Sequence, residues 1–134
     1  MKKVEAAAAK LTGVDCVYIP VTNKQEAVAW FVKHFGLVIE GDHLLAGRQE
    51  IFLLHADEQH PLYFETDDWL ADEKSYKMPV ICFQTDDILQ LYKYLLKEGI
   101  QLEELHERSW FWEFDFYDLD KNKFKVWQPK NEPQ

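Results

Sequence analysis

The sequence has 134 residues, which corresponds to one domain at the usual ~100–200 residues per domain. Hydrophobic residues make up 47% and charged residues 29%, a composition that is typical of a soluble globular chain and excludes a disordered one. The 24 acidic residues outnumber the 15 Lys and Arg residues and give a formal charge of −9. Because affinity for nucleic acid comes largely from neutralising phosphates, this balance argues against a nucleic-acid partner and leaves a neutral or cationic small molecule open.

The sequence also bears on membrane association and on the cellular compartment. No apolar run approaches the ~18 residues that a membrane span needs, and no apolar core of a signal peptide follows the first residues, so no membrane association is expected. Cys16 and Cys82 lie in apolar, strand-like runs, which predicts two buried free thiols and a cytoplasmic protein. Residues 1–13 are expected to form an N-terminal helical extension, because Glu5–Lys10 has high helix propensity.

Two segments of the chain read alike, which indicates an internal repeat. Each has a strand-like run, a capping pair, an amphipathic helix and a glycine, and corresponding positions differ by a constant 63 residues. The matched pairs are Val17 and Val80, Thr22 and Thr85, Asn23 and Asp86, and Gly36 and Gly99. One constant offset across four positions favours two copies of one unit.

The first unit is predicted to span residues 14–59. It begins with a strand over residues 14–21, because this run is rich in β-branched and aromatic residues. Thr22 and Asn23 then cap a helix that runs to His34 and that Gly36 ends. Three short strands are expected at residues 37–40, 43–46 and 50–55.

The second unit is predicted to span residues 78–128 and to repeat this order. A strand over residues 78–85 leads to a helix that is capped by Thr85, Asp86 and Asp87 and ends at Glu98, before Gly99. Strands are expected at residues 101–106, 111–118 and 123–128. Residues 60–77 are predicted to be a surface linker with a short strand at 62–65, and residues 129–134 a polar tail.

Each unit therefore reads as strand, helix, strand, strand, strand. Two such units can close one core better than one can. We predict an α+β fold in which two βαβββ repeats form a curved, mostly antiparallel sheet with the helices outside.

Two motifs at the ends of this duplication resemble a known family. The run Phe114–Trp127 is similar to the closing hairpin of the vicinal oxygen chelate superfamily, which holds glyoxalase I, bleomycin-resistance proteins, fosfomycin-modifying enzymes and extradiol dioxygenases. The runs Ile19–Asn23 and Ala27–Leu37 resemble the opening of the same family. The resemblance covers residues 14–128 and implies the glyoxalase-like fold and a homodimer.

The closing turn departs from the family pattern at two positions. Leu119 and Lys121 stand where the family usually has Pro and Gly. Asp118 is expected to accept backbone N–H bonds in this turn, and Asn122 to tolerate a left-handed conformation. Lys121 lacks the conformational freedom of glycine, which predicts a slightly strained turn or one of another type.

Metal-dependent members of the family place His, Gln or Glu ligands at four positions, and this sequence does not have them. The resemblance aligns these positions with Cys16, with Pro79 or Val80, with Phe52 or Leu54, and with Lys125. Proline, valine, leucine and phenylalanine cannot bind a metal ion, and a protonated lysine repels a cation. We therefore predict no metal, no cofactor and no set of catalytic residues.

A cavity inside the curved sheet could still bind a ligand through aromatic side chains. Alternation along the aromatic run 109–117 assigns Trp110 and Trp112 to one face, although much of this run is expected to be core. Lys125 could serve an anionic ligand group or pair with Glu113 or Asp115. The predicted ligand-binding residues are Cys16, Tyr18, Trp110, Trp112, Lys125 and Trp127.

Two hypotheses about function follow, from different classes. The first is a metal-free protein that binds an aromatic or cationic small molecule, because aromatic rings attract cations. The second is a lyase, dioxygenase or thiol transferase of the same superfamily, which would use an atypical metal site or acid–base chemistry by Cys16, His106 and Glu113. A third hypothesis is a protein-interaction module in which side chains fill the cavity.

Overall fold

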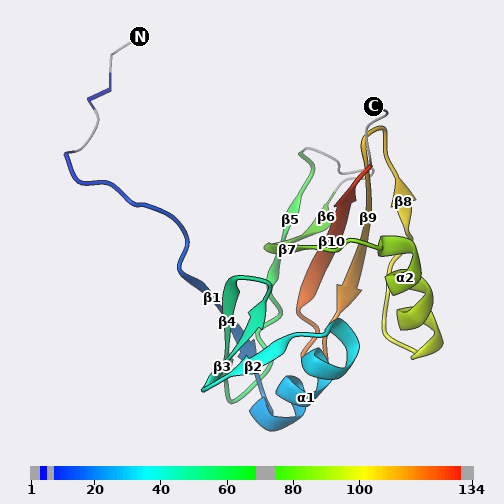
Figure 1. Ribbon diagram of the computed structural model, residues 1–134, viewed down its shortest axis with the longest axis horizontal. Coiled ribbons are helices and arrows are strands. Elements are labelled where there is room, and N and C mark those ends of the chain that lie inside the picture. The colour runs from blue at the N-terminus through cyan, green and yellow to red at the C-terminus, as the bar shows by residue number, and fades with distance from the viewer. Residues whose placement is uncertain (1–3, 6–7, 69–74, 131–134) are drawn as a thin grey trace.

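The computed structural model describes residues 4–5, 8–68 and 75–130, and within them it has two helices and ten strands (Figure 1). The elements of the first half are β1 (Cys16–Val21), α1 (Lys24–Phe35), β2 (Val38–Glu40), β3 (His43–Ala46) and β4 (Gln49–His55). A hairpin of β5 (Tyr63–Thr66) and β6 (Tyr76–Pro79) follows. The elements of the second half are β7 (Ile81–Gln84), α2 (Ile88–Lys97), β8 (His106–Glu107), β9 (Phe111–Tyr117) and β10 (Lys123–Pro129).

The predicted α+β class and the two βαβββ repeats are confirmed. The first module, β1 to β4 with α1, forms a sheet in the order β1-β4-β3-β2. The second module, β7 to β10 with α2, forms a sheet in the equivalent order β7-β10-β9-β8. The pairs β1–β4 and β7–β10 are parallel and the other pairs are antiparallel. The strands thus make two four-stranded sheets, because β1 and β7 do not pair with each other.

The helices begin and end where the sequence predicts. The Asn23 side chain accepts a hydrogen bond from the Glu26 N–H at the start of α1, and Asp87 does the same for Gln90 at the start of α2. Gly36 ends α1 with φ +66°, a conformation that glycine adopts without steric cost.

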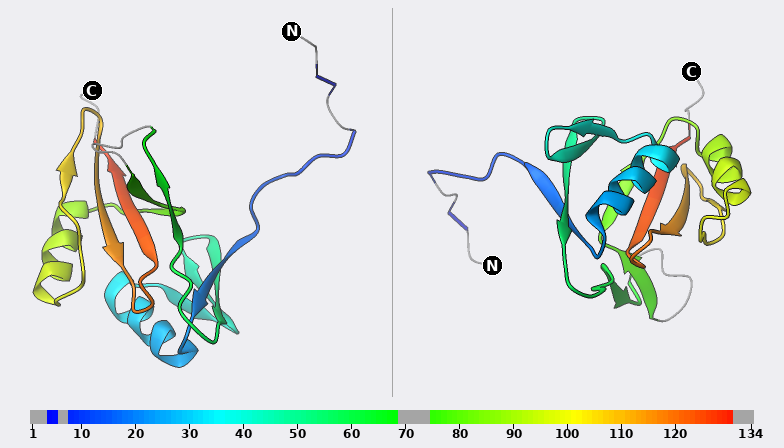
Figure 2. Two further views of the ribbon diagram at one scale, coloured as in Figure 1. Left: turned by 180° about the vertical axis from the view of Figure 1, so that it is seen from behind. Right: turned by 90° about the horizontal axis from the view of Figure 1, so that it is seen from below.

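Helix α1 lies between the two sheets and joins them into one core (Figure 2, right). Phe31 of α1 is 1% exposed and contacts Phe124 of β10 edge to face, with ring centroids 5.9 Å apart. Ile19 and Ile51 of the first sheet belong to the same buried cluster. Because both sheets turn one face toward this shared core, their other faces, called the outer faces below, point away from each other.

Three predicted elements differ in the structure. The expected strand over residues 78–85 is split between β6 and β7, because Pro79 has no N–H to continue a ladder. The expected strand over 101–106 is reduced to one bridge at Leu102 and the two residues of β8. In the predicted N-terminal helical extension, residues 4–5 and 8–13 contain no helix, while residues 1–3 and 6–7 lie outside the described part.

None of the helices within the described residues has the length and apolar character needed to cross a membrane.

Candidate functional site

The closing turn of the second module joins the two modules. The Asp120 Oδ1 accepts hydrogen bonds from the Thr22 N–H at 3.0 Å and from the Thr22 hydroxyl at 2.6 Å. The Asn122 side chain donates to the Pro20 carbonyl at 3.0 Å and accepts from the Leu62 N–H at 2.9 Å. The acidic and amide residues of the family motif therefore act here as a structural junction at the end of β1.

Inside this turn, Asp118 accepts the N–H groups of Asp120 and Asn122, each at 2.9 Å, as the sequence predicts. Burial nevertheless raises the pKa of Asp118 to about 6, against the opposing effect of these hydrogen bonds. The left-handed residue is Lys121, with φ +67°, and not Asn122. A lysine in this conformation costs roughly 1 kcal/mol relative to glycine, which is the strain that the sequence predicts.

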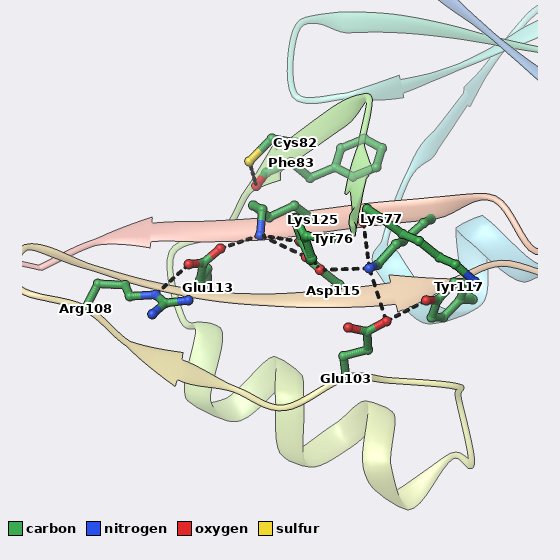
Figure 3. Close-up of polar contacts among 11 residues, drawn as sticks. Tyr76, Lys77, Cys82, Phe83, Glu103, Arg108, Glu113, Asp115, Tyr117 and Lys125 are labelled. Carbon is green, nitrogen blue, oxygen red and sulfur yellow. Dashed lines mark hydrogen bonds and ion pairs between the residues drawn. The ribbon is translucent and has the colours of Figure 1, made fainter. Parts of the chain in front are cut away.

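The outer face of β9 and β10 carries a buried network of charged groups (Figure 3). The Lys125 ammonium donates to Glu113, to the Asp115 Oδ1 at 3.0 Å and to the Tyr76 hydroxyl at 3.2 Å. Glu113 also accepts from the Arg108 Nε at 2.7 Å, and Tyr76 donates to Asp115. Of the alternatives that the sequence left open for Lys125, pairing with the two carboxylates is the one observed.

The ionised forms of these groups stabilise one another. Burial alone would raise the pKa of Glu113, but hydrogen bonds from Lys125 and Arg108 outweigh it and hold this pKa below its ordinary value. Burial alone would lower the pKa of Lys125, but the negative charges of Asp115 and Glu113 and their hydrogen bonds raise it. Burial and the Asp115 carboxylate raise the pKa of Tyr76, so this hydroxyl stays protonated.

A second buried lysine extends the network, and the sequence analysis did not identify it. Lys123 is 2% exposed and donates to the Lys77 carbonyl at 2.7 Å. Its ammonium lies 3.2 Å from Glu103 and 4.5 Å from the ring centre of Tyr76. Strand alternation could have placed Lys123 on the same face as Lys125. No local pattern places Tyr76 on this face, because Tyr76 belongs to the segment that was predicted to be a linker.

An aromatic patch lies at one end of this network. The patch consists of Trp110, Phe111 and Trp127, with the Trp110 and Trp127 ring centroids 5.9 Å apart. Trp110 is 59% exposed. It precedes β9 in a bend, so the predicted alternation does not extend to it. Trp112 lies on the opposite face of β9, where it packs against the core.

The remaining predicted ligand-binding residues lie on the outer face of the first sheet. Cys16 and Tyr18 alternate with the buried Ile19, and Tyr18 is 63% exposed. Tyr18 lies beside Phe52, and Phe52 stacks on His43 with ring centroids 4.6 Å apart. Cys16 is half-buried and Cys82 is exposed, so the expectation of two buried thiols is wrong, although both are free.

Within one chain these six residues do not form one site. Cys16 and Tyr18 lie on the first sheet and Lys125 and Trp127 on the second, with α1 and the shared core between the sheets. The Trp110 ring contacts the Trp127 ring, and Trp112 lies on the opposite face of the second sheet from both.

The positions that the resemblance aligns with metal ligands hold side chains with other partners. Lys125 is engaged by two carboxylates, Phe52 stacks on His43, and Pro79 is buried at the end of β6. Among residues 4–5, 8–68 and 75–130, no three His, Cys, Asp or Glu side chains are arranged to hold a metal ion.

Comparisons with solved structures show the same fold. An antibiotic-binding protein, TnmS3 from Streptomyces sp. CB03234, is 17% identical with a TM-score of 0.65, over 91% of this chain and 99% of that chain. A protein described as a glyoxalase-family member from Bacillus anthracis is 18% identical with a TM-score of 0.69, over 92% of this chain and 100% of that chain. The fosfomycin resistance protein FosX from Mesorhizobium loti is 16% identical with a TM-score of 0.64, over 90% of this chain and 95% of that chain.

The sequence itself gives the family. A search of curated protein sequences finds no match. The sequence profile of one family matches residues 13–126, which is most of the chain and includes both modules. This chain therefore belongs to the Glyoxalase/Bleomycin resistance protein/Dioxygenase superfamily.

Proposed function

We propose that this protein binds a small organic molecule without a metal ion, and that the ligand lies against the aromatic patch beside Lys125. The observation that carries this proposal is the Lys125 ammonium, which is held by Glu113 and Asp115. The resemblance aligns Lys125 with the final Glu ligand of metal-dependent relatives. An ammonium ion has no lone pair for a metal and repels a divalent cation, so the residues present do not fit a metal ion there.

The network beside the patch favours a neutral or cationic ligand. Three cationic side chains, Arg108, Lys123 and Lys125, are paired with three carboxylates, those of Glu103, Glu113 and Asp115. A ligand anion would have to compete with these buried carboxylates for the same ammonium groups. The exposed Trp110 ring, in contrast, offers a face for stacking or for a cation.

We further propose that a second copy of the chain completes the cavity. The outer face of the first sheet leaves Tyr18 63% and Leu54 44% exposed, and that of the second leaves Trp110 59% exposed. Because the two outer faces of one chain point apart, only another molecule can cover them. A homodimer in which the first sheet of one copy faces the second sheet of the other would bring Cys16 and Tyr18 to Trp127 and Lys125.

The names of two similar structures support the class of ligand. One is described as an antibiotic-binding protein and another as a fosfomycin resistance protein. We therefore propose an antibiotic, or a metabolite of similar size, as the ligand. We place the protein in the cytoplasm, where the free thiols of Cys16 and Cys82 would stay reduced.

Two measurements on the purified protein test this function. Elemental analysis after dialysis should find no stoichiometric metal, and titration with a panel of aromatic and cationic antibiotics should change the tryptophan fluorescence saturably. Trp127→Ala should weaken this binding by about tenfold or more, while the matched change Trp112→Ala, on the opposite face of the sheet, should have a smaller effect. Stoichiometric zinc, iron, manganese or nickel would instead favour the lyase, dioxygenase or thiol transferase.

A further inference from the structure

The outer face of the first sheet carries a carboxylate that is less engaged than those of the charged network. The Glu50 side chain is 38% exposed, and its Oε1 lies 2.9 Å from the Nε2 of His43. This Nε2 is buried but makes no hydrogen bond in the described part of the chain, so the two groups interact through charge and not through a directed bond. Glu113, in contrast, is held by hydrogen bonds from Lys125 and Arg108. Glu50 therefore keeps bonding capacity on its exposed side.

The imidazole beside Glu50 is fixed in place by its other contacts. The His43 Nδ1 shares a hydrogen bond of 3.0 Å with Asp42, and the ring stacks on Phe52, so that the side chain is 12% exposed. Glu40 of β2 stands opposite His43 in the strand register. The hydrogen bond with Asp42 raises the pKa of His43 above its ordinary value, and the Glu50 carboxylate adds to this effect, while desolvation opposes it. His43 thus gains and loses its proton beside the Glu50 carboxylate.

Aromatic and aliphatic side chains surround this carboxylate. Tyr18 of β1 pairs with Phe52 of β4, and their ring centroids are 6.0 Å apart. Glu50 precedes Phe52 by two residues in β4, so both side chains lie on the same face. Tyr18 is 63% exposed, and Leu54, two residues further along β4, is 44% exposed. A ligand on this face therefore meets an apolar surface next to one carboxylate.

The charge of this face favours a cation. None of the strands β1, β2, β3 and β4 contains a lysine or an arginine. An organic ammonium would gain a charge-assisted hydrogen bond from the Glu50 carboxylate and an attraction to the faces of the Tyr18 and Phe52 rings. A neutral ligand would cover the same carboxylate without offering a charge in return, which is unfavourable.

From this arrangement we propose that Glu50, Tyr18 and Phe52 form an ammonium-binding subsite, which selects ligands that carry a protonated amine next to an apolar group. His43 controls this subsite. Its protonated ring pairs with Glu50 and repels a second cation, whereas its neutral ring leaves the carboxylate to the ligand. The subsite lies within one chain, and its place in a cavity shared with the aromatic patch of a second copy rests on the proposed function.

Titration with naphthylmethylamine and with its neutral analogue naphthalenemethanol, followed by NMR at mildly alkaline pH, tests the subsite. We expect the amine to bind about tenfold or more tightly than the alcohol. Glu50→Gln should reduce this preference to about twofold or less. The matched control Glu58→Gln, which removes an exposed carboxylate in the loop after β4, should preserve the preference. Equal binding of amine and alcohol, or an unchanged preference in Glu50→Gln, would overturn the proposal.

A second measurement uses the unaltered protein and does not depend on how a variant folds. The affinity for naphthylmethylamine should rise by about threefold or more as the pH rises through the pKa of His43. By reciprocity, the bound amine should lower the pKa of His43, measured from the imidazole C–H resonances, and the alcohol should not. His43→Gln should keep the preference for the amine but lose its pH dependence. An unchanged pKa of His43 at saturating amine would contradict the proposal.

These results are separable from those that test the proposed function. If antibiotics bind in a manner that depends on Trp127 but the amine has no advantage over the alcohol, the proposed function stands and the subsite is wrong. If the amine is preferred and shifts the pKa of His43 but no antibiotic binds, the subsite stands and the proposed function is wrong.

Discussion

Replacing Lys125 with methionine tests whether the charged network on the outer face stabilises the fold. The substitution preserves most of the side-chain volume but removes the charge that pairs with Glu113 and Asp115, which are 2% and 5% exposed. Removing one partner of a buried ion pair typically costs about 3–5 kcal/mol, because the other charge stays buried and unpaired. Here Glu113 keeps Arg108 and Asp115 keeps Tyr76, so we expect a loss near the lower end, about 3 kcal/mol.

Urea unfolding at neutral pH measures this loss. With a slope of about 1.5 kcal/mol/M, a loss of about 3 kcal/mol lowers the midpoint by about 2 M. Lys33→Met is the matched control, since the Lys33 side chain is 68% exposed and lies 3.8 Å from Glu98. The control should cost less than about 1 kcal/mol, as exposed ion pairs do.

The double variant Glu113→Gln with Lys125→Met separates the pair from the packing of the lysine chain. Because it removes both charges, we expect its loss in free energy of unfolding to be smaller than the sum of the losses of the two single variants by at least about 1 kcal/mol. The reasoning is refuted if Lys125→Met costs no more than Lys33→Met, or if the single losses add within about 0.5 kcal/mol.

Three further predictions concern the closing turn and the acid response. Lys121→Gly should raise the free energy of unfolding by about 1 kcal/mol, measured by thermal melting, because glycine adopts the left-handed conformation freely; a lower melting temperature would contradict the strain. Asn122→Ala should lower it by about 2–3 kcal/mol in urea, since the 0% exposed Asn122 bonds to Pro20 and to a second segment; a loss below about 0.5 kcal/mol would argue against the junction. The pKa of Glu113 is lowered, so the stability that its carboxylate contributes is present above its ordinary pKa of 4.5 and is lost as the pH falls through its folded pKa. The difference in free energy of unfolding between the unaltered protein and Lys125→Met should therefore become smaller as the solution is acidified.

The fold could be predicted because its signals are local and repeated. The caps at Asn23 and Asp87, the glycine at 36 and the constant offset between the halves each depend on a few adjacent residues. The division into two sheets could not be predicted, because it depends on which strands meet across the core. Pro79 did contain a signal, since a residue without an N–H ends a ladder, and β6 stops there.

The candidate site could be predicted only where it lies on one hairpin. The register of β9 and β10 sets Lys125 opposite Asp115, a pairing that strand alternation already suggests. Arg108 and Tyr76 complete the network from outside this hairpin. Arg108 follows β8, and Tyr76 belongs to β6 in another sheet, so the alternation along β9 and β10 does not predict either of them. The bend before Phe111 likewise breaks the alternation that assigned Trp110 to the same face as Trp112.

The balance of charge in the network bears on how a ligand is selected. Since the buried lysines and Arg108 are matched by carboxylates, the net charge of −9 arises from other parts of the chain. That distant charge draws cationic molecules toward the protein but is screened at the contact itself. Under the proposed function, discrimination among these molecules would come from stacking on the aromatic patch and from the shape that a partner copy gives the cavity. Variants of Trp110 and Trp127 should therefore change which ligands bind, whereas variants of exposed acidic residues should change mainly the rate of association and its dependence on salt.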